Sequence, residues 1–397
     1  MLLTTEISTA AGGLTTRPVT PLYAEFLNAR NRKLAEILLD YVVAFSIAVV
    51  GVVTNILVIA VYAKQGFRES VAVSMTTISV WDLIKCLAGV LERFSGILSA
   101  WDPAAAYTWT NIGTAVFKYI ICYSSYVTSV MAAYVAVERC LCVSVPLKVK
   151  WLLTPRITLT ACLVISVGVF GCFAVMFGIY DIEWEWSTTF NATVAVYRKN
   201  SFYIQHEDPL FKYYNLSGIL WPLVSFVVIV IATAIITYKL KQGSKFRGSQ
   251  GSSFGGTSFN KGKRPTSQKE DRCVQQNKQL QHQQQKQQQK QEEQQQNLSK
   301  RDRQVVKMLL VIVIIYVVSL SPRISLYIAK YFVDDFYFLR RLHHSFLFVC
   351  YWLWIFDFFN GAVNFFVFYK MSSSFRSTFQ SMFSRSQNAS SQISTSK

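Results

Sequence analysis

Seven apolar segments constrain the fold of this 397-residue chain more than any other feature. A helix needs about 20 apolar residues to cross a hydrocarbon core of about 30 Å, whereas a soluble protein scatters its apolar residues at helical spacing. The segments are expected at 39–63, 71–94, 110–142, 157–180, 218–240, 304–329 and 346–369. They predict an all-α membrane protein, a seven-transmembrane helix bundle.

Polar segments precede, interrupt and follow these spans. We expect a tail at 1–38, helices one to five within 39–240, a Gln-rich insert at 241–302, helices six and seven within 303–369, and a Ser-rich tail at 385–397. The insert has too few apolar residues to fold and is predicted to be disordered. In 370–384, Phe375, Phe379 and Phe383 recur every four residues. This apolar stripe predicts a short amphipathic helix on the membrane surface.

The distribution of charge predicts the topology. The chain carries a net charge of +18, but its Lys and Arg residues lie between apolar segments, which favours membrane topology over a nucleic-acid partner. The loops after helices one, three and five are basic, and the loop after helix four is acidic. This places the N-terminus outside and the C-terminus in the cytoplasm of a multi-pass plasma-membrane protein. Asn191 and Asn215 begin glycosylation sequons that agree with this orientation.

Charged residues inside apolar segments are costly and mark candidate sites. Glu138 and Arg139 adjoin at the end of helix three, and helix two holds Asp82 and Lys85. A second group near the outer ends of the helices predicts a polar ligand pocket: Glu92, Arg93, Lys118 and Arg323. These residues could instead pair with one another or reach lipid headgroups. No phosphate loop, catalytic constellation or metal-ligand spacing is present, so we expect neither an enzyme nor a bound cofactor.

An ordered set of residues resembles the rhodopsin-like family of G-protein-coupled receptors over residues 40–383. The set is Asn55, Asp82, Glu138-Arg139-Cys140, Pro146, Pro222, Pro322 and the stretch from Asn360 through Asn364 to Phe368. The resemblance implies a receptor that binds an extracellular ligand and activates a heterotrimeric G protein. It also implies that arrestin binds after phosphorylation of the insert or the tail.

The resemblance also implies roles for individual residues. At rest, Arg139 would pair with Glu138 and with Asp302, and activation would free it to meet the G protein, with Asn364 and Phe368 taking part. A sodium site near Asp82 would include Asn55, Thr128, Asn360 and Asn364. Lys85 offers an alternative, because it could pair with Asp82 or with Asp357 and supply the cation internally. A structural charge network is therefore an alternative to sodium binding.

Several positions depart from the family pattern. Thr114 replaces the usual disulfide cysteine of helix three, and Leu320 replaces the usual Trp of helix six. Ile121 stands where amine receptors carry Asp, which argues against a monoamine in the ligand pocket. The pattern is similar to divergent invertebrate branches, namely molluscan-type chemosensory receptors and invertebrate peptide receptors.

Three interpretations other than a chemosensory receptor for a small polar ligand remain open. The chain could be a neuropeptide receptor, or a receptor-like protein that has lost coupling. It could also be an ion-coupled transporter or channel whose path is lined by Asp82, Lys85 and Asp357. An odd number of spans and the lack of a visible repeat count against a transporter.

Overall fold

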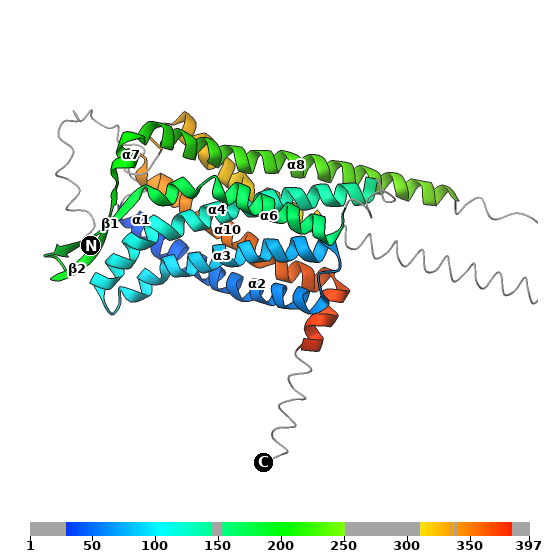
Figure 1. The fold of residues 1–397 in the computed structure, drawn as a ribbon, viewed down its shortest axis with the longest axis horizontal. Coiled ribbons are helices and arrows are strands. Elements are labelled where there is room, and N and C mark those ends of the chain that lie inside the picture. Colours follow the sequence, from blue (N-terminus) through cyan, green and yellow to red (C-terminus); the bar gives the residue numbers. More distant parts are fainter. Residues whose placement is uncertain (1–28, 145–152, 251–309, 334, 337–339, 383–397) are drawn as a thin grey trace, which may run out of the picture.

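The computed structural model describes residues 29–144, 153–250, 310–333, 335–336 and 340–382. Within these residues, seven helices are long and apolar enough to cross a membrane. They are Arg30–Gln65, Ser70–Leu98, Pro103–Ser144, Pro155–Gly178, Glu207–Lys239, Leu310–Phe332 and His343–Met371. Figure 1 shows the helices packed lengthwise into one bundle. The predicted seven-transmembrane fold is confirmed.

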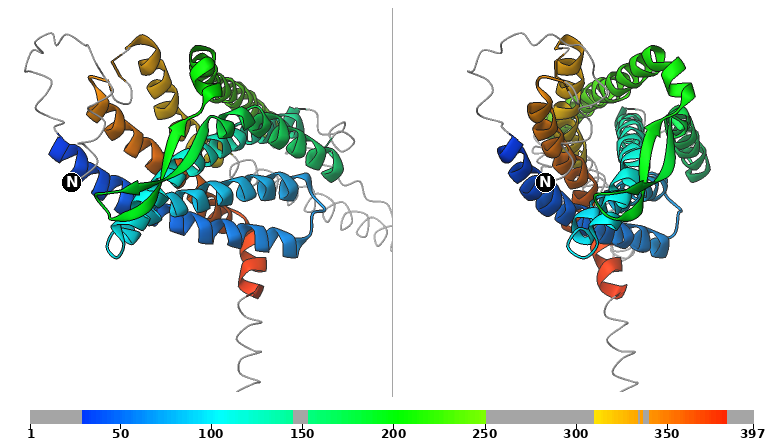
Figure 2. Two further views of the ribbon diagram at one scale, coloured as in Figure 1. Left: turned by 60° about the vertical axis from the view of Figure 1, so that its left-hand side comes forward. Right: turned by 90° about the vertical axis from the view of Figure 1, so that its left-hand side faces the viewer.

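The first span joins three segments, α1 (Ala29–Ala35), a π-helical stretch η2 (Glu36–Ala44) and α2 (Phe45–Gln65). The elements that follow are α3 (Ser70–Leu98), α4 (Pro103–Ser144), α6 (Pro155–Gly171), the 3₁₀ segment η3 (Ala174–Gly178), β1 (Tyr180–Ser187), β2 (Ala192–Lys199), α7 (Ser201–Gln205), α8 (Glu207–Gln250), the sixth span (Leu310–Phe332) and α10 (His343–Met371). The strands lie at one end of the bundle, which we name the hairpin end, and α4 runs from there to the opposite Arg139 end (Figures 1 and 2).

Capping residues explain where two spans begin. Asp102 accepts hydrogen bonds from the backbone N–H groups of Ala104 and Ala105 at 3.0 and 2.9 Å, so it caps α4. Thr154 caps α6 in the same way, and each cap is followed by a proline that needs no backbone partner. Gly66 ends α2 with φ of 81°, a left-handed conformation that glycine adopts at low cost.

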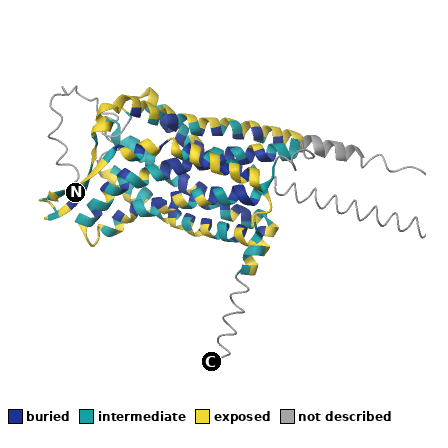
Figure 3. Cartoon of the chain, in the orientation of Figure 1, coloured by how far each residue is buried: buried dark blue, intermediate teal, exposed yellow. Residues whose placement is uncertain are grey.

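The core of the bundle is built around α4, which contacts α3, α6, α8 and β2. Its middle section is buried and rich in small and hydroxyl side chains, which permit close helix packing. Figure 3 shows buried residues gathered along the inner faces of the helices and exposed residues on the outer faces. Many exposed residues are apolar, such as Val164 and Val167. An apolar outer face is what lipid contact requires.

The region between the fourth and fifth spans differs from the predicted loop. The fourth α-helix ends at Gly171 rather than near residue 180, and α8 begins at Glu207 rather than at residue 218. Between them, β1 and β2 form an antiparallel hairpin in which Tyr180 pairs with Lys199 and Ser187 with Ala192. In 180–187, acidic and apolar side chains alternate, and a period of two residues is typical of a strand. The prediction of a loop here overlooked this pattern.

The two ends of the polar insert and the C-terminal stripe also differ in detail. Helix α8 continues through Gln250 into the predicted insert, and residues 251–309, with Asp302, lie outside the described residues. A helix spans 373–382 as expected. Phe375 is buried against Tyr62, and Phe379 packs on Phe365. This stripe therefore contacts the bundle, while Phe383 lies outside the described part.

Candidate functional site

Glu138 and Arg139 lie buried in the last turns of α4, at the Arg139 end. Arg139 Nη2 is 3.4 Å from Glu138 Oε1, and Ser74 of α3 donates to Glu138 Oε2 at 3.5 Å. Arg139 Nη1 lies 3.9 Å from Cys142 Sγ. The guanidinium Nε and Nη2 atoms make no hydrogen bond within the described residues. The arginine is thus held by one acid and keeps donors for a further partner.

Phe368 lies near the end of α10, next to the short helix at 373–382. It is 1% exposed and packs edge-on against Tyr62, with ring centroids 5.7 Å apart, and against Phe375. The side chain therefore fastens α10 to α2 and to the helix at 373–382. Phe368 was predicted to act with Arg139 as a switch residue, and the contacts that its side chain makes here with Tyr62 and Phe375 are packing contacts.

A polar core occupies the middle of the bundle, between α2, α3 and α10. Lys85 Nζ lies 2.7 Å from Asp82 Oδ1 of the same helix. Asn364 of α10 donates to Asp82 Oδ2 at 3.1 Å. Asn55 of α2 donates to the carbonyl oxygens of Gly51 and Gly361, at 2.8 and 2.9 Å. Asparagine amides therefore join the three helices.

The residues of the polar core do not fit a sodium ion. Both oxygens of Asp82 are engaged, one by the ammonium of Lys85 and one by the amide of Asn364. Thr128, predicted to join the site, donates its hydroxyl hydrogen to the backbone oxygen of Ser125 at 3.1 Å, which leaves the exclusion of sodium to the two contacts of Asp82. A metal cation would have to displace a buried ammonium from its carboxylate. Of the two sequence-based alternatives, the geometry favours the internal charge network.

Tyr316 of the sixth span is a polar-core residue that the sequence analysis missed. It is 1% exposed, and its hydroxyl lies beside Asn360, Asn364 and Thr128. Position 316 precedes Arg323 by seven residues, or two helical turns, so the helical period could have placed it on the same inward face as Arg323. The lone tyrosine in an apolar run, with a hydroxyl to satisfy, was the available signal.

A second buried ion pair joins the sixth span to α10. The Arg323 guanidinium contacts the Asp357 carboxylate, and the two side chains are 2% and 8% exposed. Arg323 Nη1 also lies 3.4 Å from Cys122 Sγ, and the guanidinium carbon is 5.3 Å from the centre of the Tyr126 ring. The Tyr126 and Tyr327 hydroxyls are 2.8 Å apart. Asp357 therefore belongs to this group, although from the sequence it was predicted to lie in the polar core as one of two possible partners of Lys85.

This group, which we name the Arg323 cluster, continues toward the hairpin end. Lys330 Nζ lies 5.2 Å from the ring centre of Tyr214 and 4.8 Å from that of Tyr327. It also donates to Asn215 Oδ1 at 2.8 Å. Asn215, a predicted glycosylation site, lies within α8. Asn191, the other predicted glycosylation site, lies in the turn between β1 and β2 with φ of 48°.

The remaining predicted pocket residues form a separate group. Arg93 contacts Asp40 of the first span, which the sequence analysis did not single out, and lies 3.3 Å from Glu92. Lys118 is half exposed and 3.9 Å from Glu92. Ile121 is fully buried in an apolar cluster with Phe358. The structure thus divides the predicted pocket into the Arg323 cluster and an Arg93 group.

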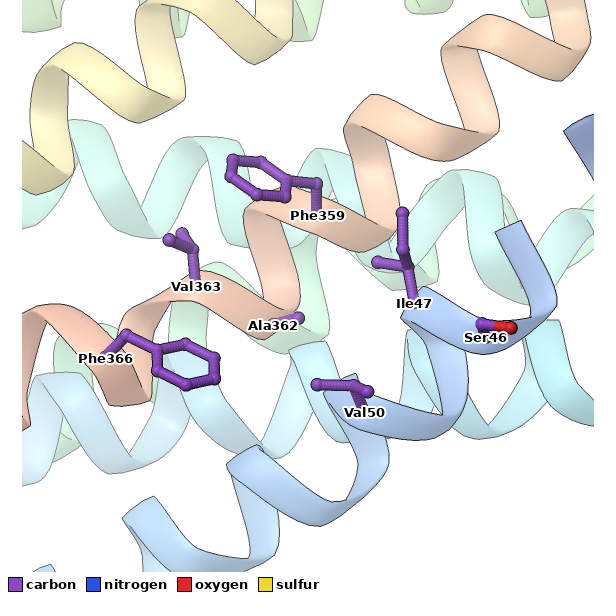
Figure 4. A pocket seen from close by; sticks show the side chains of 7 residues that line it. All are labelled: Ser46, Ile47, Val50, Phe359, Ala362, Val363 and Phe366. Atoms are coloured by element: carbon purple, nitrogen blue, oxygen red, sulfur yellow. The ribbon is translucent and has the colours of Figure 1, made fainter. Parts of the chain in front are cut away.

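A shallow groove of about 230 Å³ lies elsewhere, between α2 and α10. Figure 4 shows the seven residues that line it, Ser46, Ile47, Val50, Phe359, Ala362, Val363 and Phe366. Val50, Phe359 and Phe366 are each about half exposed on the outer face of the bundle. None of the predicted site residues lines this groove. Its apolar walls match the lipid-facing surface of the helices.

Comparison with known protein families places the chain. No curated protein matches it. A family model described as 7 transmembrane receptor (rhodopsin family) matches residues 54–364, which include Asp82, Arg139, Arg323 and Asn364. Members of this family are membrane receptors with a ligand and a G protein as partners. With seven spans and this match over most of its length, the chain belongs to the rhodopsin family of seven-transmembrane receptors.

Proposed function

We propose that this receptor is chemosensory and that it binds a small polar ligand between its helices, near the Arg323 cluster. We further propose that the hairpin end faces outward and that the Arg139 end faces the cytoplasm. A ligand would change the packing of the sixth span, and a heterotrimeric G protein would bind at the Arg139 end. The orientation rests on the basic loops at the Arg139 end and the acidic hairpin.

The proposed ligand class rests on one observation. Arg323 and Asp357 form a buried ion pair close to the hydroxyl groups of two tyrosines. These groups offer a cation, an anion and neutral hydrogen-bonding sites within one cluster. Each is buried inside the bundle, so a ligand that reaches them must be small enough to pass between the helices. A polar, zwitterionic molecule suits charges of both signs.

The signalling role rests on the arrangement around Arg139. Its ion pair with Glu138 is within α4, and its spare donors lie at the end of the bundle. We propose that Asp302, outside the described residues, completes the resting state, and that the freed guanidinium meets the G protein. Asn364 and Phe368 would transmit the movement of α10. Arrestin is a proposed partner of the phosphorylated insert or tail.

A neuropeptide receptor is the second candidate, favoured by the hairpin. Trp184 and Trp186 project from one face of β1 and are 64% and 63% exposed. Large exposed aromatic side chains at the proposed outer surface suit a peptide, which cannot reach deep into the bundle. An ion path is less favoured, because Asp82, Lys85 and Asp357 each have a charged partner inside the bundle.

The ligand class is tested by calcium release from cells that express the chain with a promiscuous G protein. Extracts of tissue and of food are applied before and after protease treatment. A response that survives protease supports the small-molecule receptor, and a response abolished by protease supports the peptide receptor. A receptor that reaches the surface but responds to neither would contradict both proposals and favour a chain that has lost coupling.

The coupling site is tested by Arg139→Ala in the same cells. We expect the calcium response to fall by at least tenfold while surface expression persists, because the residue would contact the G protein only in the active state. Arg198→Ala is the matched control, since it removes a guanidinium whose partners Glu183 and Glu185 are exposed in the hairpin. Responses from both variants as large as that of the wild-type chain would argue against the proposed role of Arg139.

A further inference from the structure

The pair of Asp82 and Lys85 is enclosed by the bundle, with the side chains 0% and 1% exposed. A carboxylate at such a position needs a cation, because the surrounding helices and lipid solvate charge poorly. Lys85 supplies that cation from the same helix, one turn away, at 2.7 Å. Its attachment to the backbone means that the cation is present at every sodium concentration.

The buried charges around this pair already cancel. Asp357 is a further buried acid that interacts with Lys85, and Arg323 contacts it directly. The charges of these two acids and two bases therefore cancel. Adding a sodium ion would make this part of the interior positive and would bring a metal cation close to the ammonium of Lys85. Like charges at short range repel strongly in such surroundings.

The structure also provides space for the lysine. A Cβ atom at Gly361 would lie 3.2 Å from Lys85 Cε and 3.3 Å from Nζ. Contacts this short are tighter than ordinary packing allows, so any side chain at position 361 would press on the ammonium. The absence of a side chain on α10 thus leaves room for Lys85 beside Asp82.

Three amide oxygens of the polar core make no hydrogen bond to the described residues, although they are buried: those of Asn55, Asn360 and Asn364. The hydroxyl of Tyr316 lies beside the side chains of Asn360 and Asn364. Buried acceptors of this kind are usually satisfied by ordered water. Water adds no charge to an interior that is already neutral.

We propose that Lys85 acts as a built-in cation that closes the polar core to sodium ions, so that the core holds water. The fold of this receptor would then be insensitive to sodium. The inference applies equally to a small-molecule and to a peptide receptor, and so it does not rest on the proposed ligand class.

The test is thermal unfolding of the purified full chain in detergent, with sodium chloride against choline chloride at equal ionic strength. We expect the same unfolding midpoint for the wild-type chain in both salts. In Lys85→Met, Asp82 loses its cation, so the midpoint should fall in choline and rise again as sodium replaces choline. If Lys85→Met does not fold, Lys85→Gln, which keeps a polar side chain, takes its place.

Two control variants isolate the cause. Lys118→Met removes a half-exposed lysine outside the polar core and should not create a dependence on sodium. Asp82→Asn combined with Lys85→Met removes both charges. The unfolding midpoint of this double variant should also be the same in sodium chloride and in choline chloride. Stabilisation of the wild-type chain by sodium over choline would overturn the proposal. So would a single Lys85 variant that folds and shows no response to sodium.

Discussion

The two buried ion pairs of this receptor differ in what they connect. Asp82 and Lys85 lie three residues apart on α3, so their pair closes within one helix. Arg323 and Asp357 lie on the sixth span and α10, so their pair closes between two helices. Both pairs are nearly free of solvent. They therefore share the cost of buried charge but respond differently to a movement of the bundle.

The difference indicates which pair can report a conformational change. A displacement of the sixth span leaves the distance between Asp82 and Lys85 unchanged, because one helix carries both. The same displacement changes the distance between Arg323 and Asp357. We therefore interpret the first pair as a fixed balance of charge and the second as a contact of the resting state. The predictions below test this contrast.

The largest effect is expected from Asp357→Ala, which leaves the buried Arg323 without its acid. Removal of one partner of a buried ion pair costs about 3–5 kcal/mol. The unfolding midpoint and the amount of receptor at the cell surface should both fall. Arg323→Met combined with Asp357→Leu should recover most of the loss, because no charge is left unpaired. A double variant as unstable as Asp357→Ala would mean that the pair itself is needed for the fold.

A smaller effect is expected on basal signalling. Asp357→Asn keeps the shape of the side chain and weakens the bridge to Arg323. A loss of about 1.4 kcal/mol from the resting state raises the ratio of active to resting receptor about tenfold. Basal calcium release, normalised to surface expression, measures this change in the ratio of active to resting receptor. The neutral double variant of Asp82 and Lys85 is the control and should leave basal signalling unchanged. An equal rise in that control would remove the contrast between the two pairs.

An effect of comparable size is expected from Gly361→Ala, which places a methyl group 3.2 Å from Lys85 Cε. Overpacking of a filled core costs about 1–3 kcal/mol. The unfolding midpoint should fall in the wild-type background. In Lys85→Ala the same methyl group meets less crowding, so the additional loss should shrink. A loss of equal size in both backgrounds would show that the crowding at position 361 comes from Cys86 Sγ, also 3.3 Å away, rather than from Lys85.

The sequence was sufficient for the fold but only in part for the pairing of charges. Apolar length predicted the seven spans, and the helical spacing of three made Asp82 one of two candidate partners for Lys85, beside Asp357. The partner of Arg323 could not be deduced, because it depends on how far the sixth span is rotated against α10. The contact of Arg93 with Asp40 was missed for the same reason. Ion pairs within one helix can be predicted from the helical period. Ion pairs between helices depend on how the helices pack, which the sequence does not show directly.

The smallest effect is expected from Lys118→Ala at the edge of the Arg93 group. Its ammonium is 49% exposed and 3.9 Å from Glu92, whereas Arg93 is buried against the same acid at 3.3 Å. An exposed ion pair is screened by solvent and contributes less than about 0.5 kcal/mol. The unfolding midpoint should therefore barely change, and Arg93→Ala should lower it clearly. If Lys118→Ala nevertheless weakened the response to an active extract without altering stability, this lysine would contact the ligand, and the Arg93 group would join the Arg323 cluster in one site.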